Sequence, residues 1–188
     1  MENTEFGARL NSFKLGLKKT EIEETGHLTL ALLRRANKAG LTCADLNFPD
    51  HLSNLEIKTL KRFSNESSIK INGLAMRYYT SPKFKLGAFS NPEKAVRELA
   101  LDETKRGIDC AASLGCETMT LWMGQDGLDY SFQADFSQMW DHTISAMQEL
   151  ADHNHSINLS IEYKPNEPRA FSLMPDVSTT LLALGEIN

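Results

Sequence analysis

The sequence predicts an α/β fold with a parallel sheet, and two observations lead to that prediction. Short apolar runs alternate with longer segments of helical periodicity five times along the chain of 188 residues. The connections between successive apolar runs are long enough to be crossovers, which join parallel strands. No low-complexity tract or linker rich in proline and glycine divides the chain, so a single domain over residues 1–188 is expected.

The expected strands are short apolar runs that end in polar or aromatic residues. They cover residues 6–13, 41–48, 117–123 and 157–163, and a further strand lies within 69–79. Pro49 ends the second run along the chain. The run over 117–123 is apolar on both faces, which is typical of a buried parallel strand.

The expected helices alternate with these strands and begin and end at capping residues. They cover residues 22–38, 55–63, 91–114 and 136–152, and a last helix starts near residue 175 or 176. Gly40 stands where the first helix would be capped, and Gly115 ends the third. Asn91 is expected to be the N-cap of the third helix, with Pro92 in its first turn.

Two architectures fit this order of elements, an open doubly wound sheet and a closed (β/α)8 barrel. No G-x-G-x-x-G motif follows the first strand, which removes the simplest argument for a dinucleotide-binding fold. A closed barrel typically needs about 250 residues, and this chain is shorter. Periodicity alone leaves the choice open.

The composition argues against several classes of function. The chain is 41% hydrophobic and 24% charged, with a formal net charge of -5, so neither nucleic acid nor an anionic membrane is expected as a partner. It has no apolar run of the about 18 residues that a transmembrane helix needs, and no signal peptide at its N-terminus. Its three cysteines lack a C-x-x-C pair. A cytoplasmic location is therefore expected.

Functional residues are expected at the carboxyl ends of the strands in either architecture. These ends offer aromatic rings, a carboxylate and an amine, a combination that suits a polyol with apolar C–H faces and polar hydroxyl groups. In chain order they read Phe48-Pro49-Asp50-His51, Arg77-Tyr78-Tyr79-Thr80, Trp122-Met123-Gly124-Gln125-Asp126-Gly127 and Glu162-Tyr163-Lys164-Pro165.

Each candidate residue at these ends also has a purely structural interpretation. Glu162 follows a predicted buried strand and needs a cation, a hydrogen-bond network or a proton, and Lys164 is close enough in sequence to form an ion pair with it. Trp122 is either part of a binding site or packed against the next helix. His51, beside Asp50, is either an oriented general base or a loop residue at the start of a helix.

Two segments resemble the xylose isomerase family. Residues 161–169 read I-E-Y-K-P-N-E-P-R and resemble its E-x-K-P-N-E-P-R signature, and residues 122–127, W-M-G-Q-D-G, resemble its W-G-G-R-E-G turn. Residues 84–89 and 111–115 are similar to the same family. The resemblance extends from about residue 78 to residue 187 and implies a (β/α)8 TIM barrel, of which this chain supplies about the first five βα units.

The resemblance also implies a reaction and a set of site residues. A divalent-metal-dependent isomerase would interconvert an aldose and a ketose, with Mg2+, Mn2+ or Co2+ as cofactor and a monosaccharide as substrate. Glu162 would be a metal ligand, and Lys164 would donate a hydrogen bond to the carbonyl end of the open-chain sugar. Trp122 would form an apolar wall, and Tyr79 stands where the family has a phenylalanine.

The sequence departs from the family in two places. The family opens the sugar ring with the histidine of an F-H-D motif, whereas this chain has Phe48-Pro49-Asp50-His51, so His51 is a candidate catalytic residue that does not align. The family's remaining metal ligands come from later strands, so the chain as written is expected to be inactive alone. The alternatives are a sugar epimerase that acts by proton transfer, and a non-catalytic half-barrel that self-associates through its open sheet edges. A homo-oligomer is expected.

Overall fold

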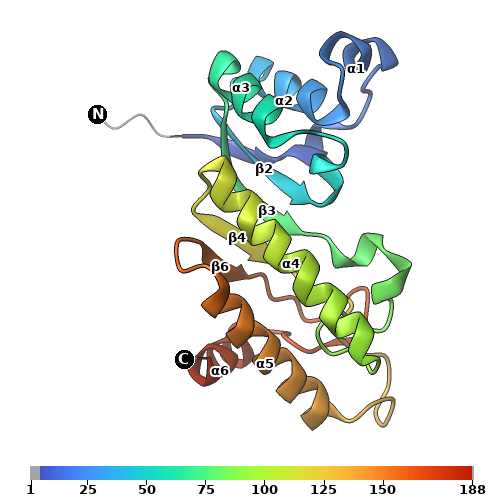
Figure 1. The fold of residues 1–188 in the computed structure, drawn as a ribbon. Coiled ribbons are helices and arrows are strands. Elements are labelled where there is room, and N and C mark those ends of the chain that lie inside the picture. Colours follow the sequence, from blue (N-terminus) through green and yellow to red (C-terminus); the bar gives the residue numbers. More distant parts are fainter. Residues whose placement is uncertain (1–4, 188) are drawn as a thin grey trace.

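A parallel sheet of five strands runs through the computed structural model, which describes residues 5–187 (Figure 1). The strands follow the order β1 (Gly7–Arg9), β2 (Cys43–Phe48), β3 (Lys70–Met76), β4 (Thr118–Leu121) and β6 (Asn158–Ile161). All neighbouring strands in this sheet are parallel. Two short strands, β5 (Gly127–Leu128) and β7 (Phe171–Ser172), form a separate antiparallel pair.

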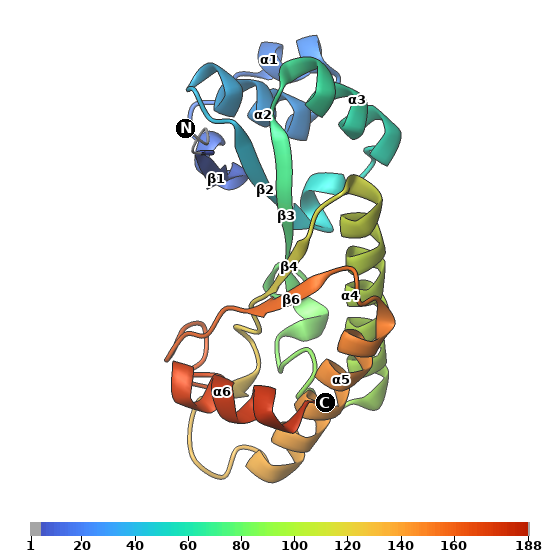
Figure 2. The same cartoon turned by 90° about the vertical axis from the view of Figure 1, so that its left-hand side faces the viewer.

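The helices lie between the strands in the chain, and Figure 2 shows α3, α4 and α5 along one side of the sheet. Their bounds are α1 (Lys19–Thr25), α2 (Leu28–Lys38), α3 (Ile57–Ser67), α4 (Lys94–Leu114), α5 (Phe136–His153) and α6 (Val177–Glu186). Short 3-10 turns follow the first three strands of the sheet. Within residues 5–187, no helix has the length and apolar character to cross a membrane.

The alternation of strands and helices is confirmed, but several boundaries differ from the prediction. The first expected helix is divided into α1 and α2 by Gly26, whose φ of 75° ends α1. The helix α4 has Glu93 as its N-cap, so the prediction for Asn91 is wrong. The Asn91 side chain instead accepts from the Glu93 N–H and donates to the carbonyl of Gly87. Gly115 caps α4 as expected.

The two faces of the sheet differ in chemistry. Side chains alternate between faces along a strand, and those facing the helices are buried and apolar, among them Leu46, Phe48, Leu74, Met76, Met119 and Leu121. The opposite face, called the polar face below, carries mostly polar side chains: Arg9, Asp45, Asn47, Thr118, Thr120, Asn158, Ser160 and Glu162. The prediction that the fourth strand is apolar on both faces is therefore wrong.

The sheet curls around its polar face. Arg9 ends β1 and Glu162 follows β6, so these residues belong to opposite edges of the sheet. In a flat sheet the two edges would be roughly 19 Å apart, because four gaps of about 4.8 Å separate five strands. The Arg9 guanidinium nevertheless contacts the Glu162 carboxylate. Such curvature is that of a barrel wall.

The strand order decides between the two predicted architectures. Each strand of the sheet is added beside the preceding one, whereas a doubly wound sheet reverses direction at a switch point. Sequential order and curvature together give an incomplete (β/α)8 barrel, built from about five βα units. In barrels of this kind the functional groups lie at the carboxyl ends of the strands.

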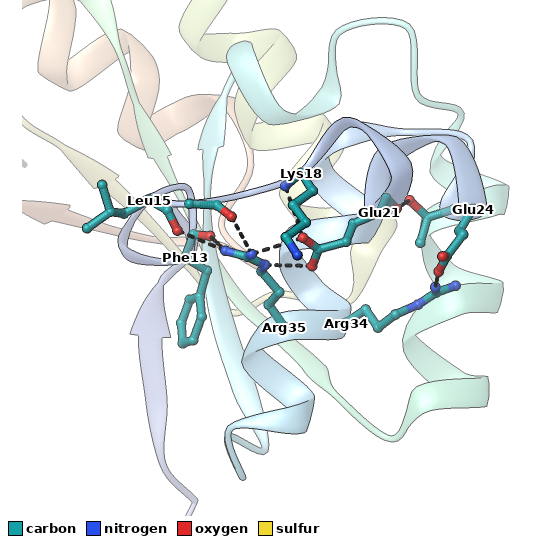
Figure 3. A network of polar contacts seen from close by, with 9 residues as sticks. Phe13, Leu15, Lys18, Glu21, Glu24, Arg34 and Arg35 are labelled. Atoms are coloured by element: carbon teal, nitrogen blue, oxygen red, sulfur yellow. Dashed lines mark hydrogen bonds and ion pairs between the residues drawn. The ribbon is translucent and has the colours of Figure 1, made fainter.

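Arg35 on α2 forms hydrogen bonds to the loop that precedes α1 (Figure 3). Its guanidinium donates two hydrogen bonds to the Glu21 carboxylate and three to the carbonyl oxygens of Phe13, Leu15 and Gly16. All five N–H groups of a guanidinium are thereby used. The hydrogen bond from Arg35 lowers the pKa of Glu21 to about 2.

Replacing Arg35 by lysine is expected to loosen this loop, because an ammonium group cannot replace the planar set of five donors. Amide hydrogen exchange of residues 14–18 should become faster in the Arg35→Lys variant. Arg34→Lys is the matched control, since Arg34 makes a single ion pair with Glu24, 3.0 Å long (Figure 3). Equal exchange in both variants would contradict the assigned role of Arg35.

Candidate functional site

Two aromatic rings meet at the carboxyl ends of β3 and β4. The ring centroids of Tyr79 and Trp122 lie 5.0 Å apart at an interplanar angle of 67°. The Lys164 Nζ lies 5.7 Å from the centroid of the Trp122 ring. A Cβ at Gly124 would come within 2.5 Å of that ring, so only glycine fits there without moving the tryptophan. The structure thus brings together three of the predicted site residues.

Glu162 joins this group from the end of β6, and its carboxylate contacts Arg9. Of the three predicted alternatives, a cation, a hydrogen-bond network or a proton, the structure shows a cation, which is Arg9. The predicted ion pair with Lys164 is not formed, because the Lys164 Nζ is bonded to Glu167 at 2.7 Å. The Glu162 side chain is 40% exposed, and the side chains of β6 are half-buried or exposed, so the prediction that Glu162 follows a buried strand is wrong.

A small pocket lies between these side chains and the segment that follows β6. It is lined by Trp122, Met123, Glu162, Lys164, Ser172 and Met174. Within residues 5–187, two buried side-chain polar atoms lack a hydrogen-bond partner, Ser172 Oγ and Arg77 Nε. Ser172 lines the pocket, and Arg77 stacks on Tyr79, the neighbour of Trp122. Ser172 therefore offers an unused hydroxyl to a molecule in the pocket, and Arg77 offers an unused N–H next to the aromatic pair.

Arg169 ties residues 161–169 to the turn after β4. Its guanidinium donates to the carbonyl oxygen of Gly127 and pairs with Asp129 at 2.8 Å. The strands β5 and β7 pair at the same place. A Cβ at Gly127 would lie 2.2 Å from the carbonyl oxygen of Phe171, so the two segments approach too closely for any side chain. The two segments that resemble xylose isomerases thus form one unit.

Asp126 anchors the same turn to the loop before α4. Its fully buried carboxylate accepts hydrogen bonds from the backbone N–H groups of Ala88 and Ser90 and from the Ser90 hydroxyl. Burial raises the pKa of the Asp126 carboxyl, and these hydrogen bonds oppose that shift. Sequence reasoning gave this residue no individual role, because its partners lie more than 35 positions away.

His51 lies apart from the aromatic pair, in the turn after β2. Its Nδ1 accepts from the Asn47 N–H at 2.9 Å, so its Nε2 carries the proton and donates to Asn11 Oδ1 at 3.0 Å. The expected orientation of His51 by Asp50 is not formed, because Asp50 is bonded to Thr80. Burial lowers the pKa of His51 to about 4.

The low pKa of His51 predicts an acid-sensitive fold. The folded value of about 4 lies below the ordinary 6.5, so the unfolded chain takes up the proton first as the pH falls. The stability contributed by neutral His51, about 3 kcal/mol, is complete above pH 6.5 and lost as the pH falls to 4. Urea unfolding should show this loss in the wild type and in His153→Gln, a surface control, but not in His51→Gln. A His51→Gln curve parallel to the wild type would contradict the assignment.

The described residues contribute little to a metal site on their own. Between residues 5 and 187, no three side chains of histidine, cysteine, aspartate or glutamate are close enough together to hold a metal ion. Hard divalent cations take about six oxygen ligands, and Glu162 is the one carboxylate that lines the pocket. The side chains present therefore do not by themselves fit a complete metal centre.

Comparison with known proteins finds similarity to a xylose isomerase, an epimerase and an AP endonuclease. A curated xylose isomerase from Thermus thermophilus is 29% identical over 117 residues, which cover 60% of this chain and 30% of that protein. D-allulose 3-epimerase from Methylomonas sp., solved with D-allulose, superposes with a TM-score of 0.72 at 15% identity. AP endonuclease, family 2, from Brucella melitensis gives a TM-score of 0.70 at 16% identity.

The chain spans only part of these proteins. It covers 59% of the solved epimerase and 64% of the solved endonuclease, while 98% of its own length is matched in each case. At these identities the superpositions show the fold alone. A family model described as xylose isomerase-like TIM barrel matches residues 33–174, about three quarters of the sequence. The chain therefore belongs to the xylose isomerase-like TIM barrel family.

Proposed function

We propose that these residues form part of the site of a divalent-metal-dependent sugar isomerase, which interconverts an aldose and a ketose by hydride shift. The convergence of Tyr79, Trp122, Lys164 and Glu162 at the carboxyl ends of three strands carries this proposal. The similarity to a curated xylose isomerase supports it.

Each of these side chains would bind a different part of an open-chain monosaccharide. Trp122 and Tyr79 offer flat apolar surfaces to its C–H groups and keep water from the reacting carbons. The Lys164 ammonium donates a hydrogen bond to the carbonyl oxygen, where negative charge develops. Glu162 would supply one ligand to Mg2+, Mn2+ or Co2+. The hydrogen bonds of His51 support a positioning role at the end of β2.

Isotope transfer tests this proposal. The full product of the gene is incubated with an aldose deuterated at C2, with and without Mn2+. We expect a ketose that keeps the deuterium at C1, formed only when the cation is present, because a hydride shift does not exchange with water. Loss of the label to solvent would indicate proton transfer, the chemistry of the epimerase alternative. Absence of any sugar product would overturn both readings.

We also propose that the chain forms a homo-oligomer through α6. Val177, Leu181 and Leu184 recur at helical spacing along α6, and all three side chains are exposed. Analytical ultracentrifugation should show a dimer or a larger species for the wild type and a monomer for a Leu181→Glu, Leu184→Glu double variant. Leu15→Glu, which alters an exposed leucine on a distant loop, is the control and should not change the mass. A monomeric wild type would contradict this proposal.

A further inference from the structure

Arg77 is a positive charge at the site that has no partner carboxylate among the described residues, 5–187. It follows β3, and its Cζ lies 4.4 Å from the centroid of the Tyr79 ring. Its Nε is buried and has no hydrogen-bond partner within residues 5–187. The Tyr79 ring in turn lies 5.0 Å from the Trp122 ring, measured between centroids. The Lys164 Nζ lies 5.7 Å from the Trp122 centroid. Arg77 and Lys164 thus lie at the two ends of a series of contacts that passes through the Tyr79 and Trp122 rings.

The other cations of the site are neutralised by acidic side chains. Arg9 pairs with Glu162, Lys164 with Glu167, and Arg169 with Asp129. In the part of the chain that the structure describes, Arg77 forms no such pair.

Asp50, in the turn after β2, has a hydrogen bond to another residue. Asp50 accepts a hydrogen bond from the Thr80 hydroxyl, whose other contact is the carbonyl oxygen of Arg77. Arg35 shows what a structural arginine looks like in this protein, since all five of its N–H groups are used. The positive charge of Arg77 is among the causes that lower the pKa of His51.

An unpaired guanidinium in a half-buried position is costly to keep. Stacking on Tyr79 covers one face of the guanidinium but leaves the buried Nε–H without an acceptor. A carboxylate or phosphate satisfies these edges with two parallel hydrogen bonds, the geometry for which arginine is best suited. A neutral hydroxyl group supplies neither the charge nor the second acceptor.

We propose that Arg77 binds an anionic group of the substrate, so that the substrate is an acidic sugar bearing a carboxylate or a phosphate. This inference rests on the proposed function, which places the carbonyl end of the sugar at Lys164. The anionic group lies at the far end of the Tyr79–Trp122 surface, against Arg77. Arg77 then determines which sugars the site accepts.

Trp122 provides the signal for a binding test on the chain of 188 residues. The sequence contains two tryptophans, and Trp140→Phe removes the one outside the site, where it stacks on Phe136. Trp122 fluorescence is titrated with D-glucose, D-glucuronate, D-glucose 6-phosphate and acetate. We expect at least one of the two acidic sugars to bind about 10- to 100-fold more tightly than D-glucose, as for a charged hydrogen-bonded pair. Whichever acidic sugar is preferred identifies the anionic group.

Three variants in the same background isolate the role of Arg77. Arg77→Gln should lower the affinity for the preferred acidic sugar about 10- to 100-fold and so remove the preference over D-glucose. Arg77→Lys, which keeps the charge and loses the planar edge, should retain part of the preference. Arg62→Gln removes an exposed arginine of α3 and should behave as the parent, which controls for net charge.

The outcomes separate failure of the inference from failure of the proposed function. Equal binding of D-glucose and both acidic sugars by the parent overturns the inference and leaves the sugar site intact. A preference that survives in Arg77→Gln also overturns it. Acetate binding as tight as D-glucuronate binding, with no response to D-glucose, overturns both, because no sugar would then be recognised. Absence of binding by all four probes overturns both as well.

Discussion

Replacing Glu162 by glutamine is expected to abolish metal-dependent isomerisation, with a loss of kcat on the order of 10³-fold or more. Glutamine keeps the size of the side chain but removes the negative charge that a divalent cation requires. The fold should remain, because Glu162 and Arg9 are both about 40% exposed or more and a pair of this kind stabilises little. The measurement is turnover of an aldose at saturating Mn2+ by the full gene product.

Glu149→Gln is the matched control for this experiment. Glu149 lies on α5 and pairs with Lys105 at 2.6 Å, so the variant also breaks a partly exposed ion pair, but away from the pocket. Its turnover should equal that of the wild type. Unchanged turnover in Glu162→Gln would remove Glu162 from the site, and with it the proposed metal dependence of this pocket.

Replacing Asp126 by alanine is expected to lower the free energy of unfolding by about 3–5 kcal/mol. The change leaves the N–H groups of Ala88 and Ser90 and the Ser90 hydroxyl buried without an acceptor. It also frees the turn that carries Trp122 from the loop before α4. Urea denaturation measures the loss, and the fluorescence of Trp122 should shift as the turn becomes mobile.

Asp129→Ala provides the comparison for Asp126. Asp129 is three residues further along the chain and pairs with Arg169, but its side chain is 44% exposed. Arg169 keeps its hydrogen bonds to Gly127, so we expect a loss of about 1 kcal/mol. Similar losses in the two variants would show that the buried network around Asp126 does not hold the turn.

Local sequence patterns predicted the elements of the fold because their causes are local. Alternating apolar runs placed the strands, and Gly115 ended α4 where its positive φ of 78° was expected. The break at Gly26 and the shift of the N-cap from Asn91 to Glu93 were missed. The Asn91 side chain donates a hydrogen bond to the preceding loop and does not cap the helix. Which of the two it does depends on tertiary contacts.

The sequence could predict only those site residues that lie directly at the ends of strands. The motifs around Trp122 and Lys164 placed both residues correctly beside one pocket. The partner of Glu162 could not be predicted, because Arg9 is 153 residues away and reaches it only through the curvature of the sheet. The sequence also could not predict that Arg77 lacks a partner among the described residues. That depends on which carboxylates the fold brings near Arg77.

A crystal structure of the protein with an alditol, the reduced form of an open-chain sugar, would show whether Trp122 and Lys164 bind a sugar chain. We expect the alditol to lie on the polar face of the sheet against the Trp122 ring. One of its hydroxyl groups should be within about 3.2 Å of the Lys164 Nζ. An alditol bound only elsewhere, for example in the groove lined by Phe136 and Trp140, would show that Trp122 and Lys164 do not form the sugar site.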